Sequence, residues 1–278
     1  MKRTVVFLAC LQFFIGSASS QVSGALPSYN ESRRGMAREQ QYKPADGGFV
    51  CENGQNRYTR ALYGGWTEYR IETSDKPVFA IVKKDHYRHL SFEVEGVPLE
   101  EAEYTWSKYG DGMRTYVLHD KRWKKFGAGV VRVKVAALHE EEGAVFEIVG
   151  DKWNGAFRVN YKLSRIADEK MHRNGDLGID APEKFDARPN EQPLAAGLCG
   201  SFGNFAHLVI REDQVANVGD ITANEIFIKT FKYYSDLGRR VVFSTPDPYI
   251  NTLGSALVMA ADGDWDGKTW LHGCIGWR

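Results

Sequence analysis

Hydrophobic and polar residues alternate along most of the chain from about residue 47 onward. In the stretch AFRVNYKLSR, the apolar residues Phe157, Val159, Tyr161 and Leu163 share one side, and polar residues occupy the other. An alternation of period two predicts a β-strand with one buried face. Similar patterns occur in VVRVKVAAL, TEYRIET, PVFAIVKK, LSFEVEG, GMRTYVLHD, GAVFEIVG, AHLVIRED, NEIFIKTFKYY and RRVVFST. So many short strands without alternating helices predict a mainly β fold, an antiparallel β-sandwich.

The pattern changes near the end of the chain. Asp247 is a residue type that caps helices, Pro248 suits the first helical position, and the apolar residues that follow repeat at helical spacing. We therefore predict a domain boundary near residue 244. The β-sandwich is expected to cover residues 47–244, and residues 245–278 to form the first helix and loop of a further domain.

The N-terminus has the pattern of a secretory signal peptide. Residues 1–20 begin with two basic residues, continue with the apolar run TVVFLACLQFFIG and end in small residues. The apolar run is shorter than the ~20 residues that span a bilayer. A lipoprotein signal using Cys10 is the alternative. We expect a secreted or periplasmic protein with a polar leader at residues 21–46, and no membrane-spanning segment.

The net charge of the chain disfavours some classes of binding partner. The chain has 36 basic and 36 acidic residues, and removal of the signal peptide takes two basic residues away. A nucleic-acid-binding face usually makes a domain clearly basic, and anionic membranes also attract basic surfaces. We therefore expect an uncharged partner rather than nucleic acid or a membrane surface.

Cysteine use is too sparse for a disulfide-stapled scaffold. The mature chain keeps Cys51, Cys199 and Cys274. One bridge between Cys51 and Cys199 is possible within the predicted sandwich, and three buried unpaired thiols are the alternative.

Known catalytic motifs are incomplete in this sequence, because residues that they require are missing. The stretch GDWDGKT is one residue short of a phosphate-binding loop and carries carboxylates that would repel phosphate. The sequence CGSFG has Cys199 where a serine-hydrolase motif needs glycine. A catalytic pair of Cys199 and His207 would need an orienting third group, and a buried cysteine beside a turn is the simpler interpretation.

The stretch DGDWDG matches the first half of a calcium-binding loop. Asp262, Asp264 and Asp266 stand at positions 1, 3 and 5, but Gly273 replaces the glutamate of position 12. Calcium is therefore a weak candidate cofactor. The alternative is a tight turn that closes the preceding helix.

An aromatic group near the C-terminus is the main candidate for ligand binding. Trp270, His272, Trp277 and Arg278 lie among glycines. Tryptophan rings can stack on sugar rings, and Arg and His can hydrogen-bond sugar hydroxyls. These four residues are the predicted substrate-binding residues. The alternative is that the tryptophans pack at a domain junction.

Two long stretches carry a family resemblance. NGQNRYTRALYGGWTEYRIETSDKPVFAI and TPDPYINTLGSALVMAADGDWDGKTWLHGCIGWR resemble large secreted proteins of Bacteroidetes-type bacteria. That family has an N-terminal β-domain, of a supersandwich-like type, followed by an (α/α)6 barrel of the six-hairpin glycosidase class. The resemblance implies that residues 245–278 are the opening of a truncated barrel, and that catalytic carboxylates would come from later helices.

The resemblance implies a non-catalytic part of a secreted carbohydrate-active enzyme that braces the barrel and contributes to its sugar cleft. Oligo- or polysaccharide is the expected partner, and no catalytic residue can be assigned in this chain. A stand-alone carbohydrate-binding module is the first alternative. It would use exposed aromatics such as Tyr63 and Trp66, or Trp106 and Tyr109. A structural cell-surface domain without a ligand is the second.

Overall fold

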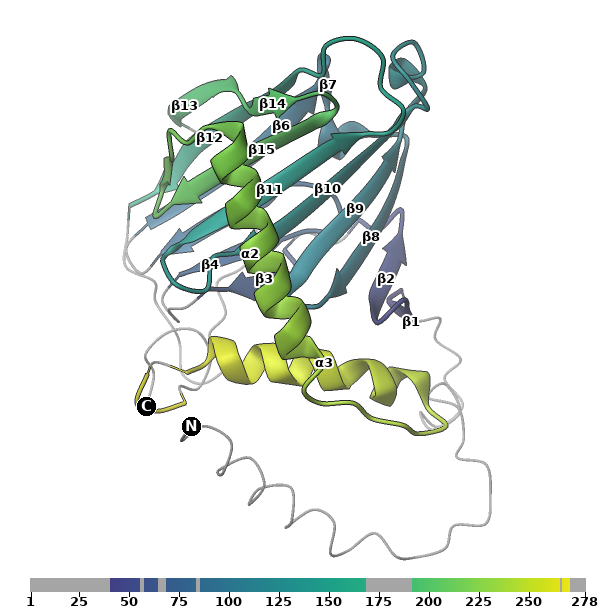
Figure 1. Cartoon of the computed structure of the whole chain (residues 1–278), viewed down its shortest axis with the longest axis vertical. Coiled ribbons are helices and arrows are strands. Elements are labelled where there is room, and N and C mark those ends of the chain that lie inside the picture. The colour runs from purple at the N-terminus through teal and green to yellow at the C-terminus, as the bar shows by residue number, and fades with distance from the viewer. Residues whose placement is uncertain are drawn as a thin grey trace, which may run out of the picture. The chain divides into compact units, whose positions relative to one another are not determined.

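Two antiparallel sheets form the greater part of the fold, as the alternating pattern predicts (Figure 1). The structure is a computed structural model, and it describes residues 41–55, 58–64, 69–83, 86–168, 192–265 and 267–270. Within these residues the first sheet has nine strands in the order β1-β2-β8-β9-β10-β11-β15-β14, with β16 paired to β15. Its strands are β1 (Lys43–Ala45), β2 (Gly48–Glu52), β8 (Tyr104–Gly110), β9 (Met113–His119), β10 (Val130–Ala137), β11 (Gly143–Gly150), β14 (Gly200–Phe202), β15 (Phe205–Arg211) and β16 (Gln214–Val215).

The second sheet has seven strands in the described residues. Their order is β13-β12-β6-β5-β4-β3, with β7 paired to β6. The strands are β3 (Arg60–Tyr63), β4 (Arg70–Thr73), β5 (Phe79–Lys83), β6 (His86–Val94), β7 (Val97–Pro98), β12 (Val159–Ala167) and β13 (Gln192–Leu198). Two short 3₁₀ helices, η1 (Leu99–Glu101) and η2 (Lys121–Trp123), lie in the connections. The predicted mainly β sandwich is confirmed.

The main core lies between the two sheets and is rich in aromatic rings. Phe79, Phe92 and Phe146 meet with ring centroids 5.1 to 6.1 Å apart in edge and tilted arrangements. Trp123 is fully buried, and its indole N–H donates to the Val94 carbonyl over 3.1 Å. Because each buried ring removes a large apolar area from water, this core is the main source of the sandwich's stability.

The segment after the last strand is helical, which corrects the prediction of further strands there. NEIFIKTFKYY was predicted as a strand, but it lies in helix α2 (Asp220–Gly238), and RRVVFST forms no strand. The buried residues Ala223, Phe227, Tyr234 and Leu237 recur at three-, four- and seven-residue intervals. This is the period of a helix with one face against the sheet, and it overrides the local β-branched and aromatic composition.

Helix α3 (Pro248–Gly263) begins as predicted. Asp247 is its N-cap, and the Asp247 carboxylate accepts the Tyr249 N–H over 2.8 Å. Val258 and Met259 join a second apolar cluster that also holds residues of α2 and of the outer face of the first sheet. Figure 1 shows α2 crossing this sheet and α3 at its lower edge. The described part of residues 245–278 therefore packs onto the sandwich within one compact unit.

The folded part starts slightly earlier than predicted, because β1 begins at Lys43, inside the predicted leader. Cys51 and Cys199 are buried free thiols, so the alternative of a bridge between them is wrong. Cys274 lies outside the described residues. In the part of the chain that the structure describes, no helix has the length and apolarity that crossing a membrane requires.

Candidate functional site

The predicted site residues fall on both sides of the limit of the described structure. Trp270, Asp262 and Asp264 are described and lie at or just after the end of α3. The predicted residues His272, Trp277, Arg278 and Asp266 lie outside the described residues.

Trp270 is anchored while its ring stays open to solvent. It pairs with Trp265 in an isolated antiparallel bridge, and the two ring centroids lie 4.6 Å apart. The Trp270 indole N–H donates to the Ala261 carbonyl over 3.0 Å, and 53% of the residue remains exposed. A large apolar ring that is fixed in place and exposed is a suitable platform for stacking, because little side-chain entropy is lost when a ligand binds.

Asp262 is held by neighbouring side chains. Its two carboxylate oxygens each lie 3.1 Å from the Tyr233 hydroxyl, which donates to them. The Tyr233 ring stacks on His139 with centroids 3.8 Å apart. Burial lowers the pKa of His139. His139 therefore supports the Tyr233–Asp262 pair mainly as a neutral ring.

The calcium prediction receives no support from the described aspartates. Asp264 is the C-cap of α3, and its backbone N–H donates to the Ala260 carbonyl over 3.0 Å. This agrees with the alternative of a turn that closes the helix. Among the described residues no group of three or more His, Cys, Asp or Glu could hold a metal ion. Because Asp266 lies outside them, the calcium loop itself stays a prediction.

A pocket lined by tyrosines lies beside this helix end. Its wall includes Tyr63, Tyr109, Tyr234 and Asp262, and it encloses about 370 Å³ of empty space including its open mouth. The Tyr234 hydroxyl donates to the Tyr63 carbonyl over 3.0 Å. Burial raises the pKa of Tyr234 well above its usual value, so this hydroxyl stays protonated and remains a donor. The pocket combines ring faces with a carboxylate acceptor.

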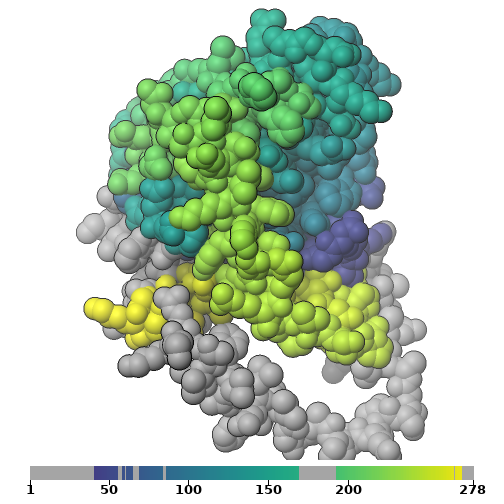
Figure 2. Space-filling view, viewed as in Figure 1, coloured from purple at the N-terminus to yellow at the C-terminus, as the bar shows by residue number. Residues whose placement is uncertain are grey.

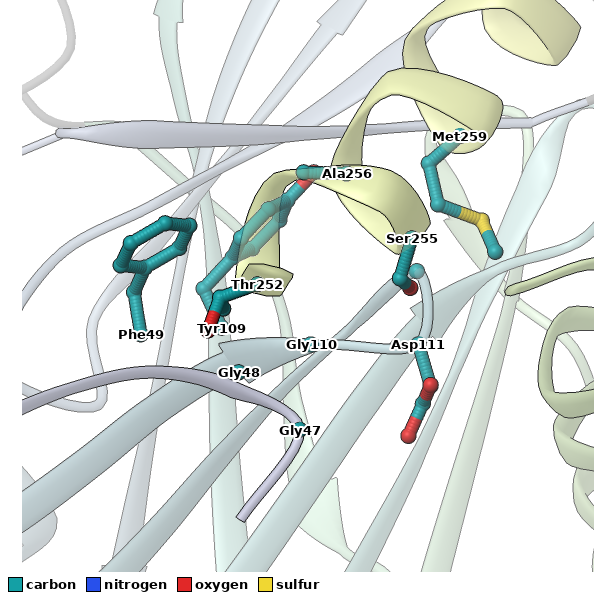
Figure 3. Close-up of a pocket in the computed structure, with 11 residues that line it drawn as sticks. Gly47, Gly48, Phe49, Tyr109, Gly110, Asp111, Thr252, Ser255, Ala256 and Met259 are labelled. Atoms are coloured by element: carbon teal, nitrogen blue, oxygen red, sulfur yellow. The ribbon is translucent and has the colours of Figure 1, made fainter. Parts of the chain in front are cut away.

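A second, smaller pocket lies along the same helix (Figure 3). Phe49 and Asp111 come from turns and strands of the sheet, and Thr252 and Ser255 come from α3. About 200 Å³ of empty space lies between them, again including open solvent. Tyr109, Gly112 and Met259 line both pockets. The two pockets are therefore neighbours where α3 meets the sheet.

The possible catalytic pair of Cys199 and His207 lacks an activated nucleophile. Burial raises the pKa of the Cys199 thiol to about 12, which opposes thiolate formation. His207 instead lies between two carboxylates: Nδ1 is 2.9 Å from Asp220, and Nε2 is 3.7 Å from Glu147. These contacts are those of a structural ion-pair group rather than of a general base aimed at a thiol.

The sequence predicted part of this site. Tyr63 and Tyr109 were candidate binding aromatics and do line the tyrosine pocket, whereas Trp66 lies outside the described residues. Tyr234 was missed because its segment was assigned to a strand. The spacing from Ala223 through Phe227 to Tyr234 is the signal that would have placed it on the inner face of a helix.

Comparison with known proteins gives one match. Residues 88–194 match the family described as a domain of unknown function, DUF4450. The matched region runs from β6 to β13 and contributes strands to both sheets. Neither the curated proteins nor the solved structures contain a match to this chain.

Proposed function

We propose that this chain is the non-catalytic N-terminal part of a secreted carbohydrate-active enzyme, and that the end of α3 contributes to its sugar cleft. The observation that carries the proposal is the position of Trp270. This anchored, exposed ring follows directly on the helix end whose residues Ala260 and Asp262 line the tyrosine pocket. Aromatic faces suit the apolar C–H faces of a sugar ring, and Asp262 can accept hydrogen bonds from its hydroxyls.

A bracing role is supported by the outward side of α3. Ile250, Leu253 and Leu257 are between 40% and 53% exposed, although they belong to the apolar stripe of the helix. An apolar helix face of this kind suits packing against further helices. In the parent enzyme we place the barrel on this face, with the two pockets at its border.

The test is binding of the full chain to a panel of soluble neutral and uronic-acid polysaccharides, measured by affinity gel electrophoresis and calorimetry. Trp270→Ala should weaken binding about ten-fold, which corresponds to about 1.4 kcal/mol. Trp270→Phe keeps a ring face and should retain most of the affinity. Leu257→Ala, at an equally exposed apolar residue of α3, is the matched control.

Two results would overturn the proposal. One is the absence of binding to every polysaccharide of the panel. The other is release of sugar by the purified chain that a single Asp or Glu substitution abolishes, because the chain would then carry its own catalytic carboxylates.

A further inference from the structure

The register of the first sheet arranges the side chains of its outer face in parallel rows. Residues directly opposite each other on neighbouring antiparallel strands share one face, so each row can be followed from strand to strand. The first row holds Met113, Ala136, Val145 and Val209. All four lie in the apolar cluster beneath α2 and α3. This row is the part of the outer face that the helices cover.

The second row is polar. It passes from Lys108 through Thr115, Lys134 and Glu147 to His207. Lys134 Nζ lies 3.6 Å from the Glu147 carboxylate, and the His207 ring lies on the other side of the same carboxylate. Lys134 and His207 are therefore accompanied by a carboxylate, whereas the Lys108 ammonium donates to the Asp46 carbonyl. The row offers both donors and acceptors.

The third row is mainly apolar and is not covered by the helices. It contains Trp106, Val117, Arg132, Val149, Phe205 and Phe202, on six neighbouring strands, and we call it the open stripe. Six strands at ~4.8 Å spacing give it a length of about 24 Å. None of its residues belongs to an apolar core cluster of the described chain. Figure 1 shows β8, β9 and β10 extending beside α2, and Figure 2 shows α2 as a ridge on this side of the molecule.

Exposure is greatest at one end of the open stripe. Phe202 is 78% exposed and Phe205 is 42% exposed, while Trp106, Val117 and Val149 are half-buried. Exposed large apolar side chains that gather on one face, as Phe202 and Phe205 do, mark an interaction surface. Arg132 interrupts the line, and its guanidinium nitrogens lie 3.2 and 3.4 Å from the Asp151 carboxylate oxygens. The one cation in the stripe is thus neutralised by its neighbour.

We propose that the open stripe binds an uncharged glycan chain laid across the strands. The inference rests on the proposed function for its ligand class but uses a different surface. Trp106 and Phe205 provide ring faces for stacking, and the polar row alongside provides donors and acceptors for hydroxyl groups. Paired charges favour a neutral ligand, because an acidic chain would meet the carboxylates of Glu147 and Asp151.

The polar groups on both sides of the stripe favour a glycan over a protein helix. A packed helix buries an apolar face at least ~100° wide, as α2 does over the first row. On its α2 side the open stripe borders the charged Lys134–Glu147 pair. On its other side it borders a row made of Tyr104, His119 and Val130, with Asp151 opposite Val130. A sugar chain matches this pattern, because its apolar ring faces are bordered by hydroxyl groups.

The test measures binding of the full chain to xyloglucan, arabinoxylan and galactomannan, with polygalacturonate as the acidic comparison. Trp106→Ala and Phe205→Ala should each weaken binding to at least one neutral polysaccharide ten-fold or more. Phe202→Ala should weaken it measurably, and its high exposure means that this change cannot unfold the core. Ile228→Ala, at an exposed apolar residue in the middle of α2, is the matched control and should bind like the wild type. Thermal melts verify that each variant is folded.

Outcomes separate this inference from the proposed function. If binding depends on Trp270 but not on the stripe residues, the stripe proposal fails and the proposed function stands. If binding depends on the stripe residues and not on Trp270, the proposed sugar cleft at the end of α3 is wrong and the stripe proposal stands. No binding at all overturns both. Binding to polygalacturonate alone, or a dimer that Phe202→Ala dissociates, would show that the stripe has a different occupant and would also overturn the inference.

Discussion

His207 and Asp220 join the sheet to the helix that crosses it. The His207 Nδ1–H donates to the Asp220 carboxylate over 2.9 Å, and Asp220 is the first residue of α2. On the opposite side of the ring, Nε2 lies 3.7 Å from Glu147, too far for a hydrogen bond but close enough for an ion pair. An imidazole buried between two carboxylates thus fixes the start of α2 on β11 and β15.

This contact predicts a pH-dependent stability. Burial lowers the pKa of His207, but the nearby carboxylates of Glu147 and Asp220 outweigh burial, so the pKa of His207 is raised. A raised pKa means that the folded state holds the proton more tightly than the unfolded state. The stabilisation is complete below the unfolded value of about 6.5 and is lost as the pH rises through the folded value.

Urea unfolding from pH 5 to pH 9 should show this loss in the wild type. His207→Gln should flatten that part of the profile, because the neutral amide cannot gain the proton. Equal pH profiles for the wild type and His207→Gln would contradict the assignment.

A second buried ion pair should be essential to the sandwich. Arg114 and Asp75 lie 3.0 Å apart and are almost completely enclosed. Tyr42 and Gln41 donate to the same Asp75 carboxylate. Asp75→Ala should cost about 3–5 kcal/mol of unfolding free energy, because it leaves the Arg114 charge buried without its partner.

The matched control for Asp75 is an exposed ion pair. Asp236 pairs with Lys232 and Arg239 on the solvent side of α2. Asp236→Ala should cost less than about 1 kcal/mol, since water screens exposed pairs. Similar losses in denaturant titrations of the two variants would show that burial does not set the strength of the Asp75 contact.

The predictability of this fold depended on how local each signal is. Strand β12, which contains Val159 and Leu163, was predictable in outline, because alternation needs no knowledge of distant residues. The Asp75–Arg114 pair was not, because its partners are 39 positions apart in sequence. Gln41 and Tyr42 belonged to an apparently featureless polar leader, and only the position of Asp75 in the fold gives them a role.

The same distinction holds for the binding surfaces. Trp270 was predictable as an exposed aromatic from its glycine-rich surroundings. The open stripe was not, because Trp106 and Phe205 become members of one row only when the strand register is known. Tyr234 required the correct choice between a strand and a helix, and short apolar runs do not decide that choice by themselves.

Two substitutions in helix α3 test whether this helix is part of the sandwich unit. Met259 is buried against the cluster that includes Tyr234 and Leu237, whereas Leu257, two residues earlier, is 53% exposed. Met259→Ala should therefore cost about 2 kcal/mol or more, and Leu257→Ala about 0.5 kcal/mol or less. The measurement is urea unfolding, in which both variants should show a single cooperative transition. A loss at neither position would mean that α3 contributes nothing to the stability of the sheet.

Gly112 offers a probe of the contact between the sheet and both helices. Asp111 and Gly112 form a two-residue turn between β8 and β9, with φ values of 52° and 68°. Glu95 and Gly96 form a comparable turn between β6 and β7, with φ values of 49° and 82°. Both are positions that favour glycine, so alanine at either should cost about 1 kcal/mol in backbone strain.

The two turns differ in what the added methyl group would meet. A Cβ at Gly96 has nothing within 4 Å, whereas a Cβ at Gly112 would lie 2.7 Å from Tyr234 Cδ1 and 2.9 Å from Met259 Sδ. Gly112→Ala should therefore cost about 1–3 kcal/mol more than Gly96→Ala, because the helices must shift to accept it. The difference in urea midpoints isolates the helix contact from the strain of the turn. In the background of Met259→Ala the added cost of Gly112→Ala should shrink, since part of the obstruction is gone and contacting residues are coupled. An unchanged cost in that background would assign the obstruction to the Tyr234 ring alone.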